Sequence, residues 1–119
     1  MQIESYKDLL VWQKATQLAI EVYELTEHFP KAEIYGLTAQ MRRSAVSIPS
    51  NIAEGSRRST RKDFRNFLFN AFGSGAELET QIEIAKHLPF GLSLDFQKID
   101  VNLQEIMRML NVMCKKLES

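Results

Sequence analysis

Apolar residues recur along most of the chain in alternating steps of four and three, the spacing that places them on one side of a helix. The first stripe consists of Val11, Ala15, Leu18, Val22, Leu25 and Phe29. It predicts a helix over about 7–28 that ends before Pro30. The second stripe consists of Leu37, Met41, Ser44, Ile48 and Ile52. It predicts a helix from near Glu33 to Gly55, where a glycine would serve as a left-handed C-terminal cap.

Two more stripes follow in the second half of the chain. The third consists of Phe64, Leu68, Ala71, Gly75, Leu78, Ile82 and Ala85. Its helix is expected to begin at Thr60, whose side chain can cap it together with Asp63, and to end at 88–91. The fourth consists of Ile99, Leu103, Ile106, Leu110, Met113 and Leu117. It predicts a helix from Ser93 or Leu94 to Leu117.

The segments between the four helices are short, at 30–32, 56–59 and 88–92. Short links force neighbouring helices to run antiparallel, and seven-residue repeats favour shallow crossing angles. The sequence shows neither sustained period-2 alternation nor an Asn-Gly or Asp-Gly hairpin signal. It therefore predicts an all-α fold, an antiparallel up-down-up-down four-helix bundle that forms one domain over 1–119.

Some apolar residues fall outside the stripes of the third and fourth helices. They are Phe67, Phe69, Phe72, Met107, Met109 and Val112. A helix that is apolar on more than one face is buried on more than one side. We therefore expect a homo-oligomer in which these residues form a subunit interface. The alternative is a wide stripe on a monomer.

The second helix also carries a polar ridge beside its apolar stripe, which we call the polar seam. It consists of Gln40, Arg43, Ser47, Asn51 and Glu54. Pro49 lies within it and costs a helix roughly 3 kcal/mol, so we expect a kink there in preference to a new helix start after Ile48. Asn51 and Glu54 have two interpretations. Either they make structural hydrogen bonds, to backbone near Pro49 and to an arginine, or they line a ligand-binding notch.

The third helix contains the small residues Gly73, Ser74, Gly75 and Ala76. Glycine inside a helix costs roughly 1 kcal/mol relative to alanine, so two glycines need a reason. We expect that the second helix or a neighbouring subunit crosses closely here. A break in the helix is the alternative.

Charge is unevenly distributed although the net charge is zero. The segment 42–65 holds seven cations and two anions, and five of these cations form what we call the basic patch. The basic patch consists of Arg57, Arg58, Arg61, Lys62 and Arg65. Cations at the start of a helix oppose its dipole, which suggests a role in binding a polyanion. No aromatic residue is expected among them, so base stacking is not predicted. The alternative interpretation is a solvated, salt-bridged end of the bundle.

Other kinds of site find little support. Cys114 is the only cysteine, so no intrachain disulfide forms, and a packed, inert thiol is expected. His28 and His87 each follow a glutamate by four residues, which does not match the Glu-x-x-His spacing of di-iron bundles. No phosphate loop, dinucleotide fingerprint, nucleophile elbow, membrane span or secretion signal is visible. We expect a cytoplasmic, non-catalytic protein with no metal and no cofactor.

The sequence resembles a bacterial family of four-helix bundles encoded in intervening sequences of 23S ribosomal RNA genes. The resemblance is carried by residues 10–15, by Phe29-Pro30 with Glu33 and 35–37, by 40–45 and 47–55, and by Gly73-Ser74 with 77–79. It implies a homopentamer, and it implies nucleic-acid binding through a basic surface. Related proteins accompany the reverse transcriptases of diversity-generating retroelements, and the family has no catalytic residues to carry over.

Two functions therefore remain open. The first is an oligomeric accessory protein that binds RNA or DNA through the basic patch, with a reverse transcriptase or another protein as a further partner. The second is a protein–protein adaptor whose basic end docks an acidic partner without nucleic acid.

Overall fold

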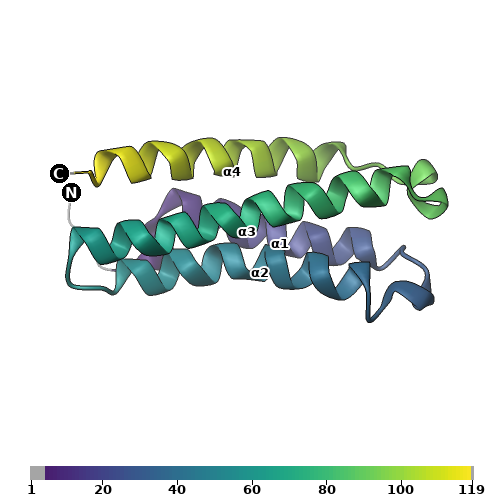
Figure 1. Ribbon diagram of the computed structural model, residues 1–119, viewed down its shortest axis with the longest axis horizontal. Coiled ribbons are helices and arrows are strands. Elements are labelled where there is room, and N and C mark those ends of the chain that lie inside the picture. Colours follow the sequence, from purple (N-terminus) through teal and green to yellow (C-terminus); the bar gives the residue numbers. More distant parts are fainter. Residues whose placement is uncertain (1–4, 119) are drawn as a thin grey trace.

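A computed structural model describes residues 5–118, and four long helices account for most of them (Figure 1). The helices are α1 (Leu10–Thr26), α2 (Leu37–Ser56), α3 (Arg61–His87) and α4 (Gln97–Lys116). Short 3₁₀ turns lie before or between them: η1 (Tyr6–Asp8), η2 (Lys31–Glu33) and η3 (Pro89–Ser93). Residues 5–118 contain no strand. The chain forms a rod measuring 47 × 21 × 21 Å.

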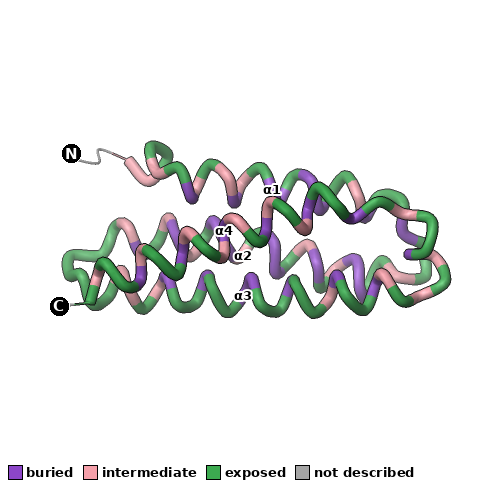
Figure 2. The backbone as a smooth tube through the Cα atoms, turned by 90° about the horizontal axis from the view of Figure 1, so that it is seen from above, coloured by how far each residue is buried: buried purple, intermediate pink, exposed green. Residues whose placement is uncertain are grey.

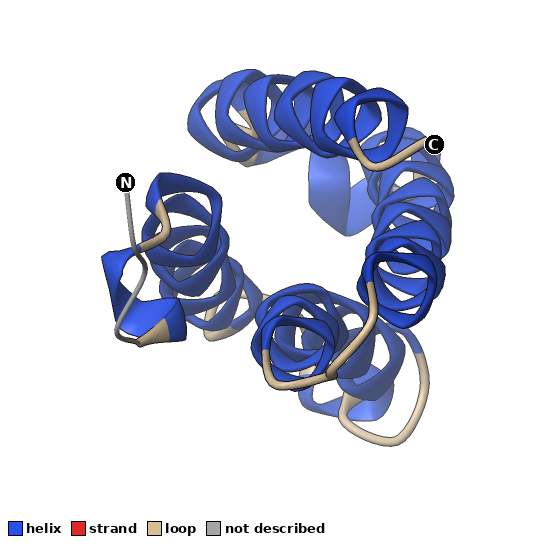
Figure 3. Cartoon of the chain, turned by 90° about the vertical axis from the view of Figure 1, so that its left-hand side faces the viewer, coloured by secondary structure: helices blue, strands red, loops and turns tan. Residues whose placement is uncertain are grey.

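Each helix runs antiparallel to the next, and the last helix closes against the first. Gly55 near the end of α2 lies against Phe67 near the start of α3, and Ser47 Oγ and Ser74 Oγ lie 2.8 Å apart at the middle of the two helices. The same reversal relates α1 to α4, where Asn102 Nδ2 donates to Glu21 Oε1 at 2.6 Å. An end-on view shows the four helices around a common axis (Figure 3). The all-α four-helix bundle predicted from the sequence is confirmed.

The apolar stripes form the core, which runs along the inside of all four helices (Figure 2). Every stripe member of α2 is buried, and so are most members of the other three. The exceptions are partly buried and pack on the core: Leu25, Phe64, Met113 and Leu117. In the last turns of α4 the buried side chain is Cys114, whereas Met113, the predicted member of the stripe, is only partly buried.

The helix boundaries differ from the predicted ones because local turns cap three helices. α1 begins at Leu10 and not at Lys7, since Leu9 is extended after the η1 turn. α2 begins at Leu37, and the Glu33 carboxylate accepts a hydrogen bond from the Leu37 amide at 3.2 Å. α4 begins at Gln97, whose amide donates to Asp95 Oδ1 at 2.9 Å.

The Thr60 cap of α3 is confirmed, because its Oγ1 accepts a hydrogen bond from the Asp63 amide at 3.1 Å. The cap predicted at Gly55 is wrong. Gly55 lies inside α2, and no residue in the described part of the chain has a positive φ. A Cβ at Gly55 would lie 2.6 Å from the Cβ of Phe67, so glycine is needed here for close packing between α2 and α3.

The small residues of α3 serve two different neighbours. The helix is continuous from Arg61 to His87, so the alternative of a break is wrong. Ser74 faces α2, and its Oγ lies 2.8 Å from Ser47 Oγ, as the expected approach of that helix requires. Gly75 instead lies against the side chain of Met107 in α4, which corrects the single-neighbour interpretation. A Cβ at Gly73 would meet nothing within 4 Å.

We expect Gly55→Ala to destabilise the fold by about 1–3 kcal/mol, the usual cost of overpacking, even though alanine favours helix. The matched control is Gly73→Ala, which fills open space and should stabilise by roughly 1 kcal/mol. Urea denaturation followed by circular dichroism measures both changes. Equal effects from the two variants would contradict the close contact assigned to Gly55.

Candidate nucleic-acid interface and polar seam

The polar seam lies along α2, and this helix continues without interruption through Pro49. The interpretation of Pro49 as a new helix start is therefore wrong. The two side chains that follow the proline bond to carbonyls that precede it: Ser50 Oγ donates to the Val46 carbonyl at 2.9 Å, and Asn51 Nδ2 donates to the Ser47 carbonyl at 2.8 Å. Proline removes the N–H that would reach the Ala45 carbonyl, and Asn51 does not replace that bond, because it donates to the Ser47 carbonyl instead.

The middle of the polar seam is a small hydrogen-bonded group between α2 and α3. Ser47 Oγ accepts from Asn51 Nδ2 at 3.0 Å and lies 2.8 Å from Ser74 Oγ. Ser74 is buried, whereas Ser47 and Asn51 are half-buried. Buried polar groups of this kind are normally paired with one another. The arrangement favours the structural interpretation of Asn51 over a ligand-binding notch.

The ends of the polar seam are exposed and do not join this group. Glu54 pairs with Arg58 at 2.8 Å, which confirms the predicted arginine partner. Gln40 is exposed. Arg43 is also exposed and lines a shallow hollow beside α1 together with Ser47. The five residues therefore form one ridge in the sequence pattern but lie in three different environments: Gln40 and Arg43 are exposed, Ser47 and Asn51 bond to each other, and Glu54 pairs with Arg58.

The basic patch lies at the end of the bundle where α2 turns into α3, next to the C-terminal end of α4 (Figure 1). Two of its arginines bond to α4. Arg61 Nη2 donates to the Lys116 carbonyl at 2.7 Å, and Arg65 Nε donates to the Cys114 carbonyl at 3.2 Å. Arg65 also pairs with Glu118 at 2.8 Å. Cations favour the negative end of a helix dipole, so these two arginines suit the end of α4.

The other three cations face solvent more openly. Arg57 and Lys62 are exposed and form no ion pair within residues 5–118, whereas Arg58 pairs with Glu54. A surface hollow adjoins two of these cations. It is lined by Tyr6, Ser50, Ala53, Glu54, Arg57 and Arg58. The structure thus divides the basic patch into two arginines that bond to the end of α4 and three cations that do not.

Aromatic rings lie beneath three of these arginines, which corrects the expectation that none accompanies the patch. The guanidinium carbon of Arg57 lies 5.3 Å from the ring centroid of Tyr6. Arg58 lies 4.7 Å above Phe67, and Arg65 lies 4.7 Å above Phe69. The four-residue spacing from Arg65 to Phe69 was a usable helical signal. Tyr6 could not be found this way, because it comes from the other end of the sequence.

Within residues 5–118, no group of histidine, cysteine and acidic side chains is arranged to hold a metal ion. The ring Nδ1 of His87 lies 2.8 Å from the Glu83 carbonyl in its own helix. Burial raises the pKa of the Cys114 thiol, and the nearby Arg65 charge only partly offsets this effect. The thiol is therefore protonated at neutral pH, as expected of a packed side chain. Among the described helices, none is long and apolar enough to cross a membrane.

We expect Asn51→Ala to destabilise the fold by about 0.5–1.5 kcal/mol, because it removes the hydrogen bonds donated to Ser47. The control is Gln40→Ala on the exposed part of the polar seam, which should change the free energy of unfolding by less than about 0.5 kcal/mol. Chemical denaturation measures both values. If Asn51→Ala left stability unchanged, its hydrogen bonds would not hold α2 in place.

Comparison with known proteins agrees with this geometry. No curated protein matches the chain. A crystal structure of a protein with unknown function from the S23 ribosomal protein family of Bacteroides thetaiotaomicron VPI-5482 superposes with a TM-score of 0.77. The superposed part covers 89% of this chain and 99% of the other chain, with 23% sequence identity, which shows that the two proteins share a fold. The model of the family described as 23S rRNA-intervening sequence protein matches residues 7–112. The chain belongs to the family of 23S rRNA-intervening sequence proteins.

Proposed function

We propose that the protein is a non-catalytic, oligomeric accessory protein that binds nucleic acid through its basic patch. The observation that carries the proposal is the clustering of five cations at one end of the bundle, with Arg57 and Lys62 outside any ion pair of the described chain. Local positive charge attracts a polyanion even when the whole protein is neutral. Phosphate contacts also release counterions, which adds to the affinity.

Two acidic residues that pair with arginines of the patch set the conditions for binding. Glu54 holds Arg58, and Glu118 holds Arg65. Both pairs are at least partly exposed, and exposed ion pairs contribute only about 0–1 kcal/mol. A phosphate can therefore replace either carboxylate at small cost. Arg57 and Lys62 need no such exchange, so we assign them the first contact with the ligand.

Self-association is part of the proposal because apolar side chains remain exposed on two faces. One face surrounds the shallow hollow between α1 and α2, where Tyr23, Ile34 and Val46 are 43%, 53% and 41% exposed. The other includes Phe72 and Val112 on α3 and α4. Apolar patches of this kind commonly mark protein interfaces. The family resemblance suggests five subunits, which would place five basic patches in one assembly.

The location and the partner protein extend the same proposal. We place the protein in the cytoplasm, which suits a chain whose single cysteine, Cys114, is a free buried thiol. A reverse transcriptase is a reasonable partner by analogy with the related accessory proteins. If the partner is an acidic protein and no nucleic acid is bound, the protein is an adaptor instead.

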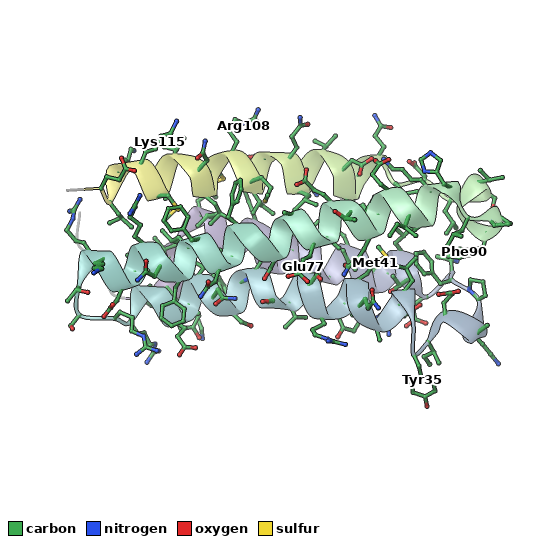
Figure 4. The ribbon with its side chains drawn as sticks, viewed as in Figure 1. Tyr35, Met41, Glu77, Phe90, Arg108 and Lys115 are labelled. Atoms are coloured by element: carbon green, nitrogen blue, oxygen red, sulfur yellow. The ribbon has the colours of Figure 1, made fainter. Side chains whose placement is uncertain are left out.

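We expect Arg57→Ala/Arg58→Ala to weaken binding of a labelled RNA or DNA oligonucleotide at least tenfold at low salt. The matched control, Lys31→Ala/Arg108→Ala, removes the same charge away from the patch, and Arg108 points outward from α4 (Figure 4). Fluorescence anisotropy over a salt series measures both. For single strands, the slope of log affinity against log salt should be less steep by about 1.4 in the patch variant, since each of the two lost phosphate contacts contributes about 0.7 to the slope.

Affinity that is the same for the patch variant and the control would contradict the proposed site. Binding of an acidic protein that survives nuclease treatment, together with no oligonucleotide binding, would replace the proposal with the adaptor.

We expect the wild-type protein to have a solution mass several times its subunit mass of 13.7 kDa. Val46→Glu should shift it toward the monomer, because a charge buried in an apolar interface is costly. The control is Leu92→Glu, which places the same charge at a position that is 79% exposed. Analytical ultracentrifugation measures the mass, and circular dichroism checks that both variants fold. A wild-type mass of one subunit at micromolar concentration would refute self-association.

A further inference from the structure

We infer that the basic patch selects single-stranded over double-stranded nucleic acid, because three of its arginines lie over aromatic rings and offer planar groups to unpaired bases. The inference rests on the proposed function and adds the form of the ligand. Its basis is the set of three arginine–aromatic pairs, Arg57 with Tyr6, Arg58 with Phe67 and Arg65 with Phe69.

The three pairs are spread around one end of the bundle. Tyr6 precedes α1, so its pair with Arg57 lies between α1 and α2. The pair of Arg58 and Phe67 joins the end of α2 to α3. The pair of Arg65 and Phe69 lies on α3 where that helix meets α4. A flexible strand can follow such a series from one helix to the next, whereas a straight duplex contacts only part of it.

The hollow beside the first pair has room and hydrogen-bonding groups for a base. Its volume of 620 Å³ falls in the range of about 300–1,000 Å³ typical of small-molecule pockets. Glu54 lies on its wall, and its carboxylate and the Ser50 hydroxyl can bond to the amino and imino groups of a base. Lys62 lines a separate hollow with Arg61 and Arg65, and it is left to bind phosphates of the same strand.

The arginine side chains are also held before any ligand arrives. Tyr6 packs edge-on against Trp12 with ring centroids 5.2 Å apart, so the ring beneath Arg57 is fixed. Arg58 is held by both Phe67 and Glu54. A side chain already in place loses less conformational entropy on binding. Bases stack on guanidinium planes and aromatic rings when they are unpaired, but in a duplex they are stacked on each other.

The test compares an unstructured fluorescein-labelled 15-nucleotide RNA with the same RNA annealed to its complement. Wild-type protein should bind the single strand about tenfold more tightly, a difference that stacking of one or two bases supplies. The key variant is Arg57→Lys/Arg58→Lys, which keeps both charges but removes both planar groups. It should lose most of the single-strand preference and bind the duplex within twofold of wild type.

Two further measurements separate stacking from a structural role. Arg108→Lys is the matched control and should behave as wild type. Trp12 is the only tryptophan, and its fluorescence should be quenched by the single strand but not by the duplex, because it contacts Tyr6.

The outcomes distinguish this inference from the proposed function. If the protein bound neither RNA form, both this inference and the proposed function would be refuted. Equal affinity for the two forms would refute single-strand selection and leave the proposed function standing. A preference that Arg57→Lys/Arg58→Lys retains in full would also overturn the inference, because charge alone would then account for it.

Discussion

The close contact between α2 and α3 is the constraint on which the other features depend. Gly55 lets the backbone of α2 approach Phe67, and the hydrogen bond between Ser47 and Ser74 fixes the same two helices farther along. This contact sets where the chain turns after α2, and therefore where the cations of the basic patch lie. It also brings the Phe67 ring beneath Arg58, so the packing of two helices determines the surface offered to a ligand.

The sequence was sufficient for the helices and the core because burial follows helical periodicity directly. It was less informative at helix ends, where 3₁₀ turns and side-chain caps such as Glu33 compete with α-helix at low cost. Gly55 shows the limit most clearly. Both a left-handed cap and a close helix contact favour glycine, and only the position of Phe67 distinguishes them.

The candidate site was predictable in composition but not in detail. The five cations could be read from the chain, yet their different environments depend on residues far away in sequence. Arg61 and Arg65 bond to the end of α4, and Arg57 lies over Tyr6. Family membership does not fill this gap, because the solved structure from Bacteroides thetaiotaomicron VPI-5482 is itself of unknown function. The local contacts are therefore the only guide to chemistry.

Arg65 gives the molecule a link between its surface and its last helix. The same guanidinium bonds to the Cys114 carbonyl and to Glu118, so it cannot keep both and turn fully toward an outside anion. Two equilibria that share one side chain are coupled, and the coupling is equal in both directions. Binding of an anion to Arg65 would destabilise the final turn of α4. Anything that stabilises that turn would then weaken the binding of the anion by the same factor.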